Sequence, residues 1–438
     1  MGEPQMEFKR TIPVRHKVDV FVAGGGPAGV AAALAAARHG SSVFLAEGQA
    51  CFGGMGTAGL VPAFMRFTDG VNFLAGGVGQ EIYEMTRHYA DLPVDRPASS
   101  VSINVEALKR VYDDLMTASG AGFAFQTQVI GIEAEGGHVT HAICAAKSGI
   151  YAVEARTFVD GTGDGDIAAW AGAPFQKGDA DGDMMPGTLC SLWSDVDWTR
   201  VTGSQDRALE RAFEDGAFTV QDRHLPGMWQ VSDHVGGGNI GHTFGVDGTD
   251  ERSLTEALLW GRKSLKEYEA YYKQYLEGFE AMHLVVTGAL LGLRETRRIL
   301  GDYLLCLDDF KTRAIFEDEI GRYAYPVDIH PSRPTAGDYA HFQEEFETLR
   351  YKDGESYGIP YRSLTPWGLD NVLVGGRCIS SDRFMQGSVR VMPGCYITGQ
   401  ATGVAAAMAA ETGVSVHSLN IRELQRRLRA MGAYLPNA

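Results

Sequence analysis

The sequence contains few cysteines, and none of them stands close to another in the chain. Six cysteines occur in 438 residues, at positions 51, 144, 190, 306, 378 and 395, and no CxxC motif is present. This scatter excludes the spacing of a zinc site or of a disulfide framework. It also disfavours a disulfide reductase, whose chemistry needs two neighbouring thiols. We therefore expect a protein of the reducing cytoplasm that holds no metal.

Positive charge and long apolar runs are also scarce. Lysine and arginine total 39 against 55 acidic residues, which gives a net charge of −16. Such a surface repels phosphate groups, so we expect no nucleic-acid partner. No apolar run approaches the ~20 residues that span a bilayer. Residues 1–17 are polar and contain no hydrophobic signal core. We therefore expect neither a membrane span nor a signal peptide.

Glycine, in contrast, is abundant. The 55 glycines are about one residue in eight, against a usual share of about 7%. They follow no G-X-Y period, and 45% of the residues are hydrophobic, so the chain is neither collagen-like nor a linker. A chain of this length and apolar content can form two or three domains.

A β-α-β unit with a glycine-rich turn is predicted near the N-terminus. Residues 18–23 (VDVFVA) have the β-branched, apolar pattern of a buried strand, and the small-residue helix after the turn ends at Gly40. A second predicted strand, 42–46, completes the unit. The turn itself is GGGPAG at 24–29. Because this G-x-G-x-x-G lies between a strand and a helix, it predicts a dinucleotide-binding site.

Each glycine of the turn has its own predicted role. Gly24 permits a tight turn, Gly26 lets the backbone approach a pyrophosphate, and Gly29 lets the helix pack closely on the strand. The phosphates would lie at the helix N-terminus, where free N–H groups and the helix dipole favour an anion. Glu47, which follows the second strand, is placed to accept hydrogen bonds from ribose hydroxyls.

Three further glycine-rich segments follow in the chain. Gly53-Gly54 comes shortly after Glu47, and DGTGDGD occupies 160–166 at the end of a strand predicted at 155–160. The third segment, 371–410, has the pattern of a strand, a glycine turn, a loop and a final helix over 399–411. The spaced aspartates of the second segment are also compatible with calcium. They lack the Glu at the twelfth position of an EF-hand loop, so we predict no metal.

These motifs, in this order, resemble the bacterial FAD-dependent oxidoreductase family of the glutathione-reductase-like flavoprotein superfamily. The resemblance rests on five segments: EGQACFGGMGTAGLV (47–61), FVDGTGDGDIAAWAGAP (158–174), LGLRETRRILGDY (291–303), IPYRSL (359–364) and NVLVGGRCISSDRFMQGSVRVMPGCYITGQATG (371–403). It implies FAD as the cofactor and an α/β fold, in which a Rossmann-like FAD-binding domain is interrupted by an α+β substrate domain. Where many relatives are expected to carry a histidine after the GRCIS segment, this chain has Arg383.

A change in the composition of the sequence between about 175 and 365 also indicates a division into domains. We expect the FAD-binding domain at 18–174 and 366–412, the substrate domain at 175–365, and a C-terminal helical tail at 413–438. Apolar spacing predicts a helix over 104–119 and an antiparallel meander over 123–159.

The glycine motifs and the resemblance together predict the residues that contact FAD. The helix over 399–411 would point its N-terminus at the flavin pyrimidine and stabilise the charge of the reduced ring. The complete predicted set is Gly24, Gly26, Pro27, Ala28, Gly29, Glu47, Gly53, Gly54, Met55, Thr57, Val129, Gly161, Thr162, Gly163, Asp166, Gly376, Arg377, Arg390, Gly399 and Thr402.

Histidines in a second glycine-rich stretch are candidates for the substrate chemistry. His224, His234 and His242 lie in HLPGMWQVSDHVGGGNIGHTFG, a composition that fits a loop lining a cavity. A neutral His234 or His242 is a suitable acceptor for a hydroxyl or amine proton while hydride leaves for flavin N5. The alternative is that they are ordinary core or surface histidines.

Arginines form a second group of candidates. Arg294 stands in a charged cluster with Glu295, Arg297 and Arg298, and helical spacing would place Arg294 and Arg298 on one face. Arg294, like Arg383, is a candidate partner for a substrate carboxylate or for the flavin edge. The alternative is a salt-bridge network that joins two domains.

The predicted function is that of an FAD-dependent oxidoreductase that transfers a hydride between a small polar organic substrate and flavin N5, as a dehydrogenase or oxidase. Only one dinucleotide motif is present, so electrons would pass to oxygen, a quinone-like acceptor or a carrier protein rather than to a dedicated NAD(P)H domain. Two alternatives stay open: a flavin-dependent reductase of an activated C=C bond, with Arg294 or Arg383 as acid or carboxylate partner, and a non-redox nucleotide-fold binding protein. Homo-oligomerisation is compatible with either.

Overall fold

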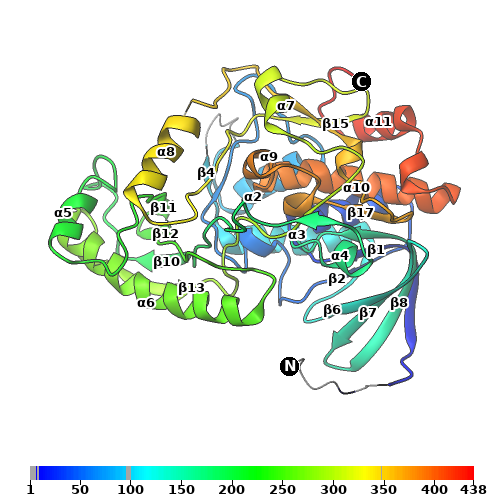
Figure 1. The fold of residues 1–438 in the computed structure, drawn as a ribbon, viewed down its shortest axis with the longest axis horizontal. Helices are drawn as coiled ribbons and strands as arrows, with labels where there is room; N and C mark the ends of the chain where they lie inside the picture. The colour runs from blue at the N-terminus through cyan, green and yellow to red at the C-terminus, as the bar shows by residue number, and fades with distance from the viewer. Residues whose placement is uncertain (1–5, 7–8, 95–99, 347) are drawn as a thin grey trace.

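A computed structural model describes residues 6, 9–94, 100–346 and 348–438 (Figure 1). Of the segment predicted to contain no signal core, residues 1–17, positions 1–5 and 7–8 lie outside the described residues. No described helix combines the length and the apolar character needed to cross a bilayer.

The largest sheet contains the predicted β-α-β unit. Its strands lie in the order β5-β2-β1-β8-β7-β6, and β17 pairs with the end of β8. Strands β5, β2, β1, β8 and β17 are parallel, whereas β6, β7 and β8 form an antiparallel meander. Their bounds are β1 Val14–Ala23, β2 Val43–Ala46, β5 Gly122–Ala124, β6 Gln128–Glu135, β7 His138–Ala146, β8 Gly149–Asp160 and β17 Val372–Val374. The predicted doubly wound domain and its meander are confirmed.

Helix α1 (Pro27–Arg38) crosses the sheet between β1 and β2. Gly26 is its N-cap and Pro27 stands in its first turn, where the missing N–H costs nothing. The chain leaves the helix through Gly40, whose φ of +83° is readily adopted by glycine. From Ala28 to Ala36 every residue of α1 is buried, so the helix is apolar on all sides.

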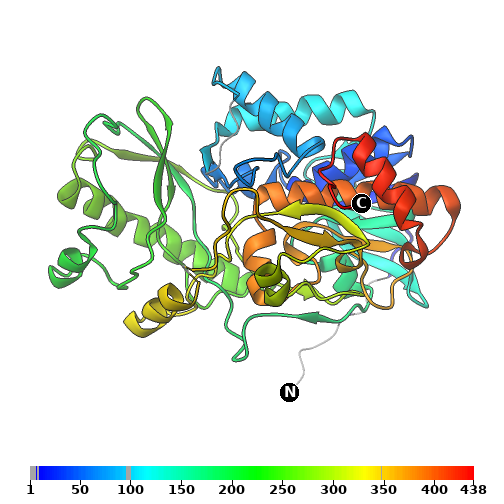
Figure 2. The same cartoon turned by 90° about the horizontal axis from the view of Figure 1, so that it is seen from above.

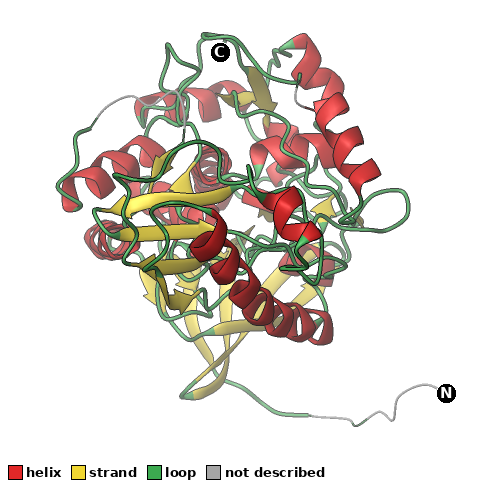
Figure 3. Ribbon diagram, turned by 90° about the vertical axis from the view of Figure 1, so that its left-hand side faces the viewer, coloured by secondary structure: helices red, strands yellow, loops and turns green. Residues whose placement is uncertain are grey.

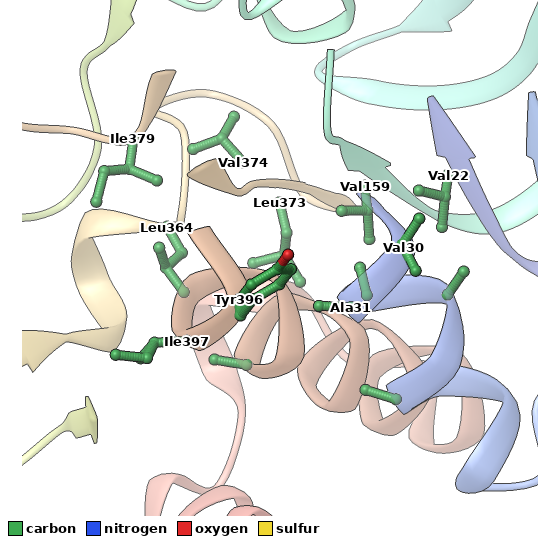
Figure 4. Packing of buried hydrophobic residues seen from close by; sticks show 14 of the residues in the cluster. Val22, Val30, Ala31, Val159, Leu364, Leu373, Val374, Ile379, Tyr396 and Ile397 are labelled. Atoms are coloured by element: carbon green, nitrogen blue, oxygen red, sulfur yellow. The ribbon is translucent and has the colours of Figure 1, made fainter. Parts of the chain in front are cut away.

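Helix α10 (Met392–Thr412) packs directly on α1 (Figure 4). A β-carbon on Gly399 would lie 2.2 Å from the Ala28 carbonyl oxygen. The backbones of the two helices are therefore in direct contact. Val30 of α1 and Tyr396 of α10 belong to the hydrophobic core around this contact. The prediction that this helix begins at Gly399 is wrong. It begins at Met392, so Gly399 and Thr402 lie within the helix.

Three further helices pack around α1 and α10. Helix α3 (Val105–Ser119) begins after Asn104, whose side chain accepts a hydrogen bond from the Ala107 N–H, and it ends at Gly120. This agrees with the predicted helix at 104–119. Helix α2 (Val78–Tyr89) packs beside it, and α11 (Ile421–Ala430) packs on α10.

A second unit lies to one side of the body that the largest sheet and its helices form (Figure 2). It consists of the antiparallel sheet β11-β12-β10-β13 and the long helix α6 (Glu251–Tyr275). The strand bounds are β10 Ser191–Ser194, β11 Gly227–Ser232, β12 Val235–Asn239 and β13 His283–Thr287, and a short helix, α5, spans Leu209–Glu214. This unit has its own hydrophobic cluster, whose buried members run from Leu189 to Leu291.

The two hydrophobic clusters divide the chain at different points from the predicted domains. Buried side chains between Ile299 and Leu364 belong to the first cluster, although these positions fall within the predicted 175–365 domain. The domain boundaries themselves stay a prediction.

The remaining elements are shorter, and loops join them to the rest of the chain (Figure 3). They are β3 Ala63–Phe64, β4 Val101–Ser102, α4 Asp166–Trp170, β9 Phe175–Gln176, β14 Arg298–Ile299, α7 Leu307–Thr312, β15 Glu319–Tyr323, α8 Ala336–Phe346, β16 Tyr357–Pro360 and α9 Arg383–Val389, with single 3-10 turns at Gly54–Gly56, Tyr361–Ser363, Gly376–Cys378 and Val416–Ser418. Residues 291–297 form no helix, so the prediction that Arg294 and Arg298 share a helix face is wrong.

Candidate functional site

The glycine turn after β1 forms a narrow backbone cradle. Gly24 has a φ of +83°, and a β-carbon there would lie 2.8 Å from the Gly161 carbonyl oxygen. A β-carbon on Gly29 would lie 1.8 Å from the Gly24 carbonyl oxygen. Above Gly26 there is space, because its nearest neighbour would be the Gly161 oxygen at 3.9 Å. No side chain caps the start of α1, so this N-terminus is free to accept the phosphates of a dinucleotide.

Glu47 holds the cradle in shape. Its carboxylate is buried and accepts hydrogen bonds of 2.6 Å from the backbone N–H groups of Gly25 and Gln49. Burial raises the pKa of Glu47, and the two hydrogen bonds oppose that rise. Both carboxylate oxygens thus bind backbone, and contact with a ribose stays a prediction.

The second glycine pair closes the cradle from the other side. The Gly53 N–H donates to the Gly25 oxygen at 2.8 Å, and a β-carbon on Gly54 would lie 3.3 Å from the Gly26 Cα atom. The predicted contacts Met55 and Thr57 follow at once, in and after the turn Gly54–Gly56. The Thr57 hydroxyl donates to the Phe52 oxygen. The two glycine motifs therefore lie against each other.

The DGTGDGD segment meets the same cradle. Gly161 approaches Gly29 so closely that a β-carbon would lie 2.9 Å from the Gly29 Cα atom. Asp160 is fully buried and accepts hydrogen bonds from the Thr162 hydroxyl and the Ala168 N–H. Burial, only partly offset by these bonds, raises the pKa of Asp160 to about 6.

Arg377 joins this segment to the neighbouring loop. Its guanidinium donates to the Gly163 oxygen, to the Leu293 oxygen and to the Asp164 carboxylate at 2.9, 2.8 and 2.6 Å. Asp166 is held in turn by Arg297, at 2.7 Å.

The other predicted FAD contacts occupy varied positions. Gly376 precedes Arg377 with a φ of +84°, and its N–H donates to the Thr398 hydroxyl. Val129 lies half-buried in β6, and Thr402 is fully buried in α10. Whether each of these residues touches the cofactor stays a prediction.

A second cluster lies where the two units meet and contains His242. Its Nδ1 atom lies 2.8 Å from Asp222 Oδ2, and its Nε2 atom lies 3.0 Å from His330 Nδ1. His330 Nε2 in turn lies 3.4 Å from Asp328 Oδ1, and the Arg390 Nη2 group donates to Asp328 Oδ2 at 3.1 Å. The result is a continuous chain, Asp222–His242–His330–Asp328–Arg390, which is buried at both histidines and partly exposed at Asp328, and which we call the histidine chain.

Local structure fixes the members of the histidine chain. His242 follows β12 and Gly241, whose φ is +78°, and its carbonyl oxygen accepts from the Trp260 indole N–H. His330 lies in the segment after β15. The His224 ring packs against the His330 ring with 4.3 Å between centroids. The backbone N–H of His224 donates to Asp222 Oδ1.

Burial and neighbouring charges set the protonation of this chain. Burial, followed by the neighbouring His242, lowers the pKa of His224 to about 4. Burial, followed by Arg294 and His224, lowers the pKa of His330 well below its ordinary value. Burial opposes ionisation of Asp328, but His330 and Arg390 outweigh it and hold the pKa of that carboxyl below its usual range. At neutral pH, His224 and His330 are neutral and Asp328 is ionised.

The histidine chain can accept one proton. Three contacts join Asp222 to His242, His242 to His330 and His330 to Asp328, and each needs one hydrogen. An imidazole carries one N–H group in its neutral form, so two neutral rings would leave one of the three contacts without a hydrogen. Among the described residues, neither Asp222 Oδ2 nor His242 Nδ1 has a hydrogen-bond partner. A third proton completes the chain. Such a buried array of imidazoles between carboxylates has the capacity of a general base.

The sequence analysis identified only part of this cluster. It predicted His242, but nothing in the sequence pointed to His330 or Asp328, which lie 88 and 86 positions further on. Asp222 carried a weak signal, because it stands two residues before His224. The other predicted histidine, His234, is exposed in the turn between β11 and β12 and takes no part in the histidine chain.

The two predicted arginines differ in their surroundings. Arg383 is bound by protein groups: Glu295 at 3.3 Å, Asp179 at 3.4 Å and Ser332 at 2.7 Å. Arg294 is buried beside the histidine chain and has no carboxylate within ion-pair distance in the described part of the chain. Arg298, by contrast, pairs with the buried Glu295.

Among the described residues, no group of three or more His, Cys, Asp or Glu is arranged to hold a metal ion. The histidine chain is linear, with each nitrogen facing a neighbour rather than a common centre.

Comparison with known proteins identifies the family. The family described as FAD dependent oxidoreductase matches residues 19–428. The chain belongs to this family. Its cofactor is FAD, and the open cradle over Gly26, at an uncapped helix N-terminus, fits the pyrophosphate of that cofactor. No curated protein sequence matches the chain significantly.

Several solved structures have a partly similar course of chain. A geranylgeranyl bacteriochlorophyll reductase-like protein from Thermoplasma acidophilum is 12% identical with a TM-score of 0.47, over 95% of this chain and 84% of that one. A myxobacterial chondrochloren halogenase is 14% identical with a TM-score of 0.44, over 95% and 79%. The p-nitrophenol 4-monooxygenase of Pseudomonas putida DLL-E4 is 11% identical with a TM-score of 0.43, over 94% and 84%. Similarity at this level does not identify an activity.

Proposed function

We propose that this FAD-dependent oxidoreductase transfers a hydride between a small polar organic substrate and flavin N5, as a dehydrogenase or oxidase. The observation that carries the proposal is the histidine chain, which lacks one hydrogen. Bound FAD supplies the hydride acceptor. Oxidation of an alcohol or amine also releases a proton from oxygen or nitrogen, and the chain is built to take that proton.

Asp328 is the point at which the proton enters. Its side chain is 26% exposed, whereas those of His242 and His330 are 1% and 5% exposed. Both nitrogens of His242 face neighbours, so His242 acts through the chain and does not touch the substrate. The proton passes from Asp328 through His330 to His242, where Asp222 stabilises the imidazolium that forms.

The residues of the glycine cradle hold the cofactor in this proposal. Backbone N–H groups at the start of α1 bind the pyrophosphate, and Glu47 keeps the turn in place. The assignment to the glutathione-reductase-like superfamily, a bacterial origin and a cytoplasmic location belong to the same proposal. So do a discontinuous FAD-binding domain and an electron acceptor that is oxygen, a quinone-like compound or a carrier protein.

Anaerobic bleaching of the bound flavin tests the proposal directly. FAD-loaded protein is mixed with a panel of hydroxy acids, amino acids, sugars and amines, and the flavin absorbance is followed. We expect at least one compound class to bleach the flavin, and His242→Gln to slow bleaching by 10²-fold or more with an altered pH profile. His283→Gln, an exposed histidine in β13, is the matched control and should leave the rate unchanged.

Other outcomes would favour the alternatives. If no compound bleaches the flavin but activated enoates reoxidise the chemically reduced protein, the enzyme is a C=C reductase. Purified protein that stays colourless when FAD is supplied would indicate a non-redox binding protein.

A further inference from the structure

Arg294 is a buried guanidinium that binds only neutral groups. It is 5% exposed. Its Nη1 group donates to the Pro186 oxygen at 2.8 Å and to the Thr188 hydroxyl at 2.9 Å, and its Nη2 group donates to Asn239 Oδ1 at 3.2 Å. These three bonds use three of the five N–H donors of the side chain.

The other buried arginines are paired with carboxylates. Arg298 faces Glu295, and Arg322 faces Glu319 at 2.8 Å. Within the described residues, Arg294 is therefore the buried arginine without a counter-ion. A buried charge without a partner is costly, and buried charges in proteins are normally paired, so a bound anion would supply the partner that Arg294 lacks.

A second guanidinium with an unused donor lies nearby. Arg390 binds the Asp328 oxygens through Nη2, but its buried Nε–H has no acceptor within the described residues. The two arginines belong to one neighbourhood, because Gln386, one helical turn before Arg390, donates to the Arg294 carbonyl oxygen at 2.6 Å. Burial, followed by the neighbouring charge of Arg390, lowers the pKa of Arg294 to about 10. An anion between the two side chains would relieve this repulsion and accept the unused N–H donors.

The chemistry of the Arg294 guanidinium suits a carboxylate. Arg390 is paired with Asp328 at 3.1 Å, whereas Arg294 has no carboxylate within ion-pair distance among the described residues. A carboxylate supplies one negative charge and two planar acceptor oxygens, which suit a guanidinium fork. A phosphate dianion would leave excess negative charge beside Asp328.

We infer that Arg294, with Arg390 beside it, binds the carboxylate of the substrate, and that the substrate is a small 2-hydroxy or 2-amino monocarboxylate. This inference rests on the proposed function, because it names the substrate class of the same site. The carboxylate fixes one end of the molecule, and the hydroxyl or amine on the next carbon then lies toward Asp328.

The chemistry of this class balances. The C–H bond of the 2-carbon breaks, and its electron pair leaves with the hydrogen as hydride, so the substrate is oxidised and FAD is reduced. The O–H or N–H proton passes to the histidine chain. A C=O or C=N bond forms, and the product is a 2-oxo or 2-imino carboxylate.

Ligand binding separates this inference from the proposed activity. Pyruvate, a 2-oxo monocarboxylate, and its uncharged match pyruvamide are titrated into FAD-loaded protein, with calorimetry and the flavin spectrum as readouts. We expect pyruvate to bind at least tenfold more tightly than pyruvamide. In Arg294→Met this preference should vanish and pyruvate affinity should fall at least tenfold, whereas Arg294→Lys should retain part of it. Arg200→Met, which removes an exposed arginine paired with Glu280, is the control.

Three outcomes overturn the inference: no saturable binding of pyruvate, equal affinity for both probes, or unchanged pyruvate affinity in Arg294→Met. If Arg294→Met does not fold, the comparison of the two probes on the unaltered protein still decides. If pyruvate binds as expected but no compound bleaches the flavin, the anion site stands and the proposed activity fails. If a neutral alcohol bleaches the flavin as fast as hydroxy acids do, the activity stands and the anion site fails.

Discussion

Gly403 on helix α10 lies against the backbone of Ala32 on helix α1, so close that a β-carbon on Gly403 would stand 2.2 Å from the Ala32 carbonyl oxygen. Gly399 meets Ala28 in the same way, four residues earlier on both helices. The stripe of small residues on α10 thus packs two helices from opposite ends of the chain against each other. Gly399 is also a predicted FAD contact, which stays a prediction, but its approach to the Ala28 backbone is enough to require glycine at this position.

Gly403→Ala should therefore destabilise the protein. Alanine is the better helix former by about 1 kcal/mol, so an open site would gain stability. Here the methyl group meets backbone that cannot move alone, and we expect a loss of about 1–3 kcal/mol in the free energy of unfolding. Gly337 in α8 is the control, because a β-carbon there would meet only the Thr335 hydroxyl at 3.9 Å. Urea unfolding of Gly403→Ala and Gly337→Ala measures both, and a stabilised Gly403→Ala would contradict the close packing.

Glu295 should be one of the most sensitive positions for stability. Its carboxylate is fully buried and serves Arg298, Arg383 and the Met185 N–H. Glu295→Ala leaves the buried Arg298 without a counter-ion and leaves Arg383 with Asp179 alone, so we expect a loss of about 3–5 kcal/mol.

The exposed pair Arg200–Glu280 provides the comparison for this prediction. Glu280→Ala should change the free energy of unfolding by less than about 1 kcal/mol, because solvent already screens the pair. Similar losses in both variants, measured by urea unfolding at one pH, would show that the Glu295 network does not stabilise the fold.

His224 should make stability depend on pH. Its folded-state pKa of about 4 lies below the ordinary 6.5, so between these values the unfolded chain binds more protons than the folded one. Stability then falls as pH drops from 6.5 towards 4, and is unaffected by this group above 6.5. The contribution is about 2 kcal/mol at pH 4.5, after a discount for the partial exposure of the ring.

His224→Gln removes that contribution. Urea unfolding at pH 7.5, 5.5 and 4.5 should give a shallower pH dependence in the variant than in the unaltered protein, with the largest difference at pH 4.5. Parallel curves would mean that His224 titrates normally in the folded state.

Glu47→Ala should weaken FAD binding. The variant loses the acceptor for the Gly25 and Gln49 N–H groups, so the glycine turn is no longer held in the shape that receives the pyrophosphate. We expect the Kd for FAD to rise by about tenfold or more, which corresponds to about 1.4 kcal/mol. Fluorescence titration of the apoprotein measures it, with the exposed Glu133→Ala as control. An unchanged Kd would rule out this role.

Local patterns predicted much of the fold, and the β-α-β unit in particular. Strand β1, the glycine turn and α1 are continuous in sequence, and their apolar spacing determines them without help from distant segments. The predicted start of α10, Gly399, is too late in the chain. Pro393 stands in the first turn of the helix, where proline is tolerated because its missing N–H has no partner there in any case. Residues 291–297 have helical charge spacing, but their side chains bind Pro186 and Asp164, more than 100 positions earlier. Tertiary contacts override the local pattern in that segment.

The candidate site was likewise predictable from the sequence only in part. The cradle glycines were predictable because the G-x-G-x-x-G spacing between a strand and a helix is itself the signal of a dinucleotide site. The histidine chain was not, because Asp222, His242 and His330 come from three separate loops and no spacing relates them. Burial and the unpaired state of Arg294 are likewise properties of the folded molecule alone.

Strand β8 has a consequence for the order in which the protein matures. It pairs with β1, with β7 and, at its end, with β17, which lies more than 200 residues further along the chain. The small-residue face of helix α1 is covered by α10, which lies more than 350 residues further along the chain. The contact between the two helices therefore forms late, after the segments between them have been synthesised. Until then the nascent chain must keep an apolar helix out of aggregates.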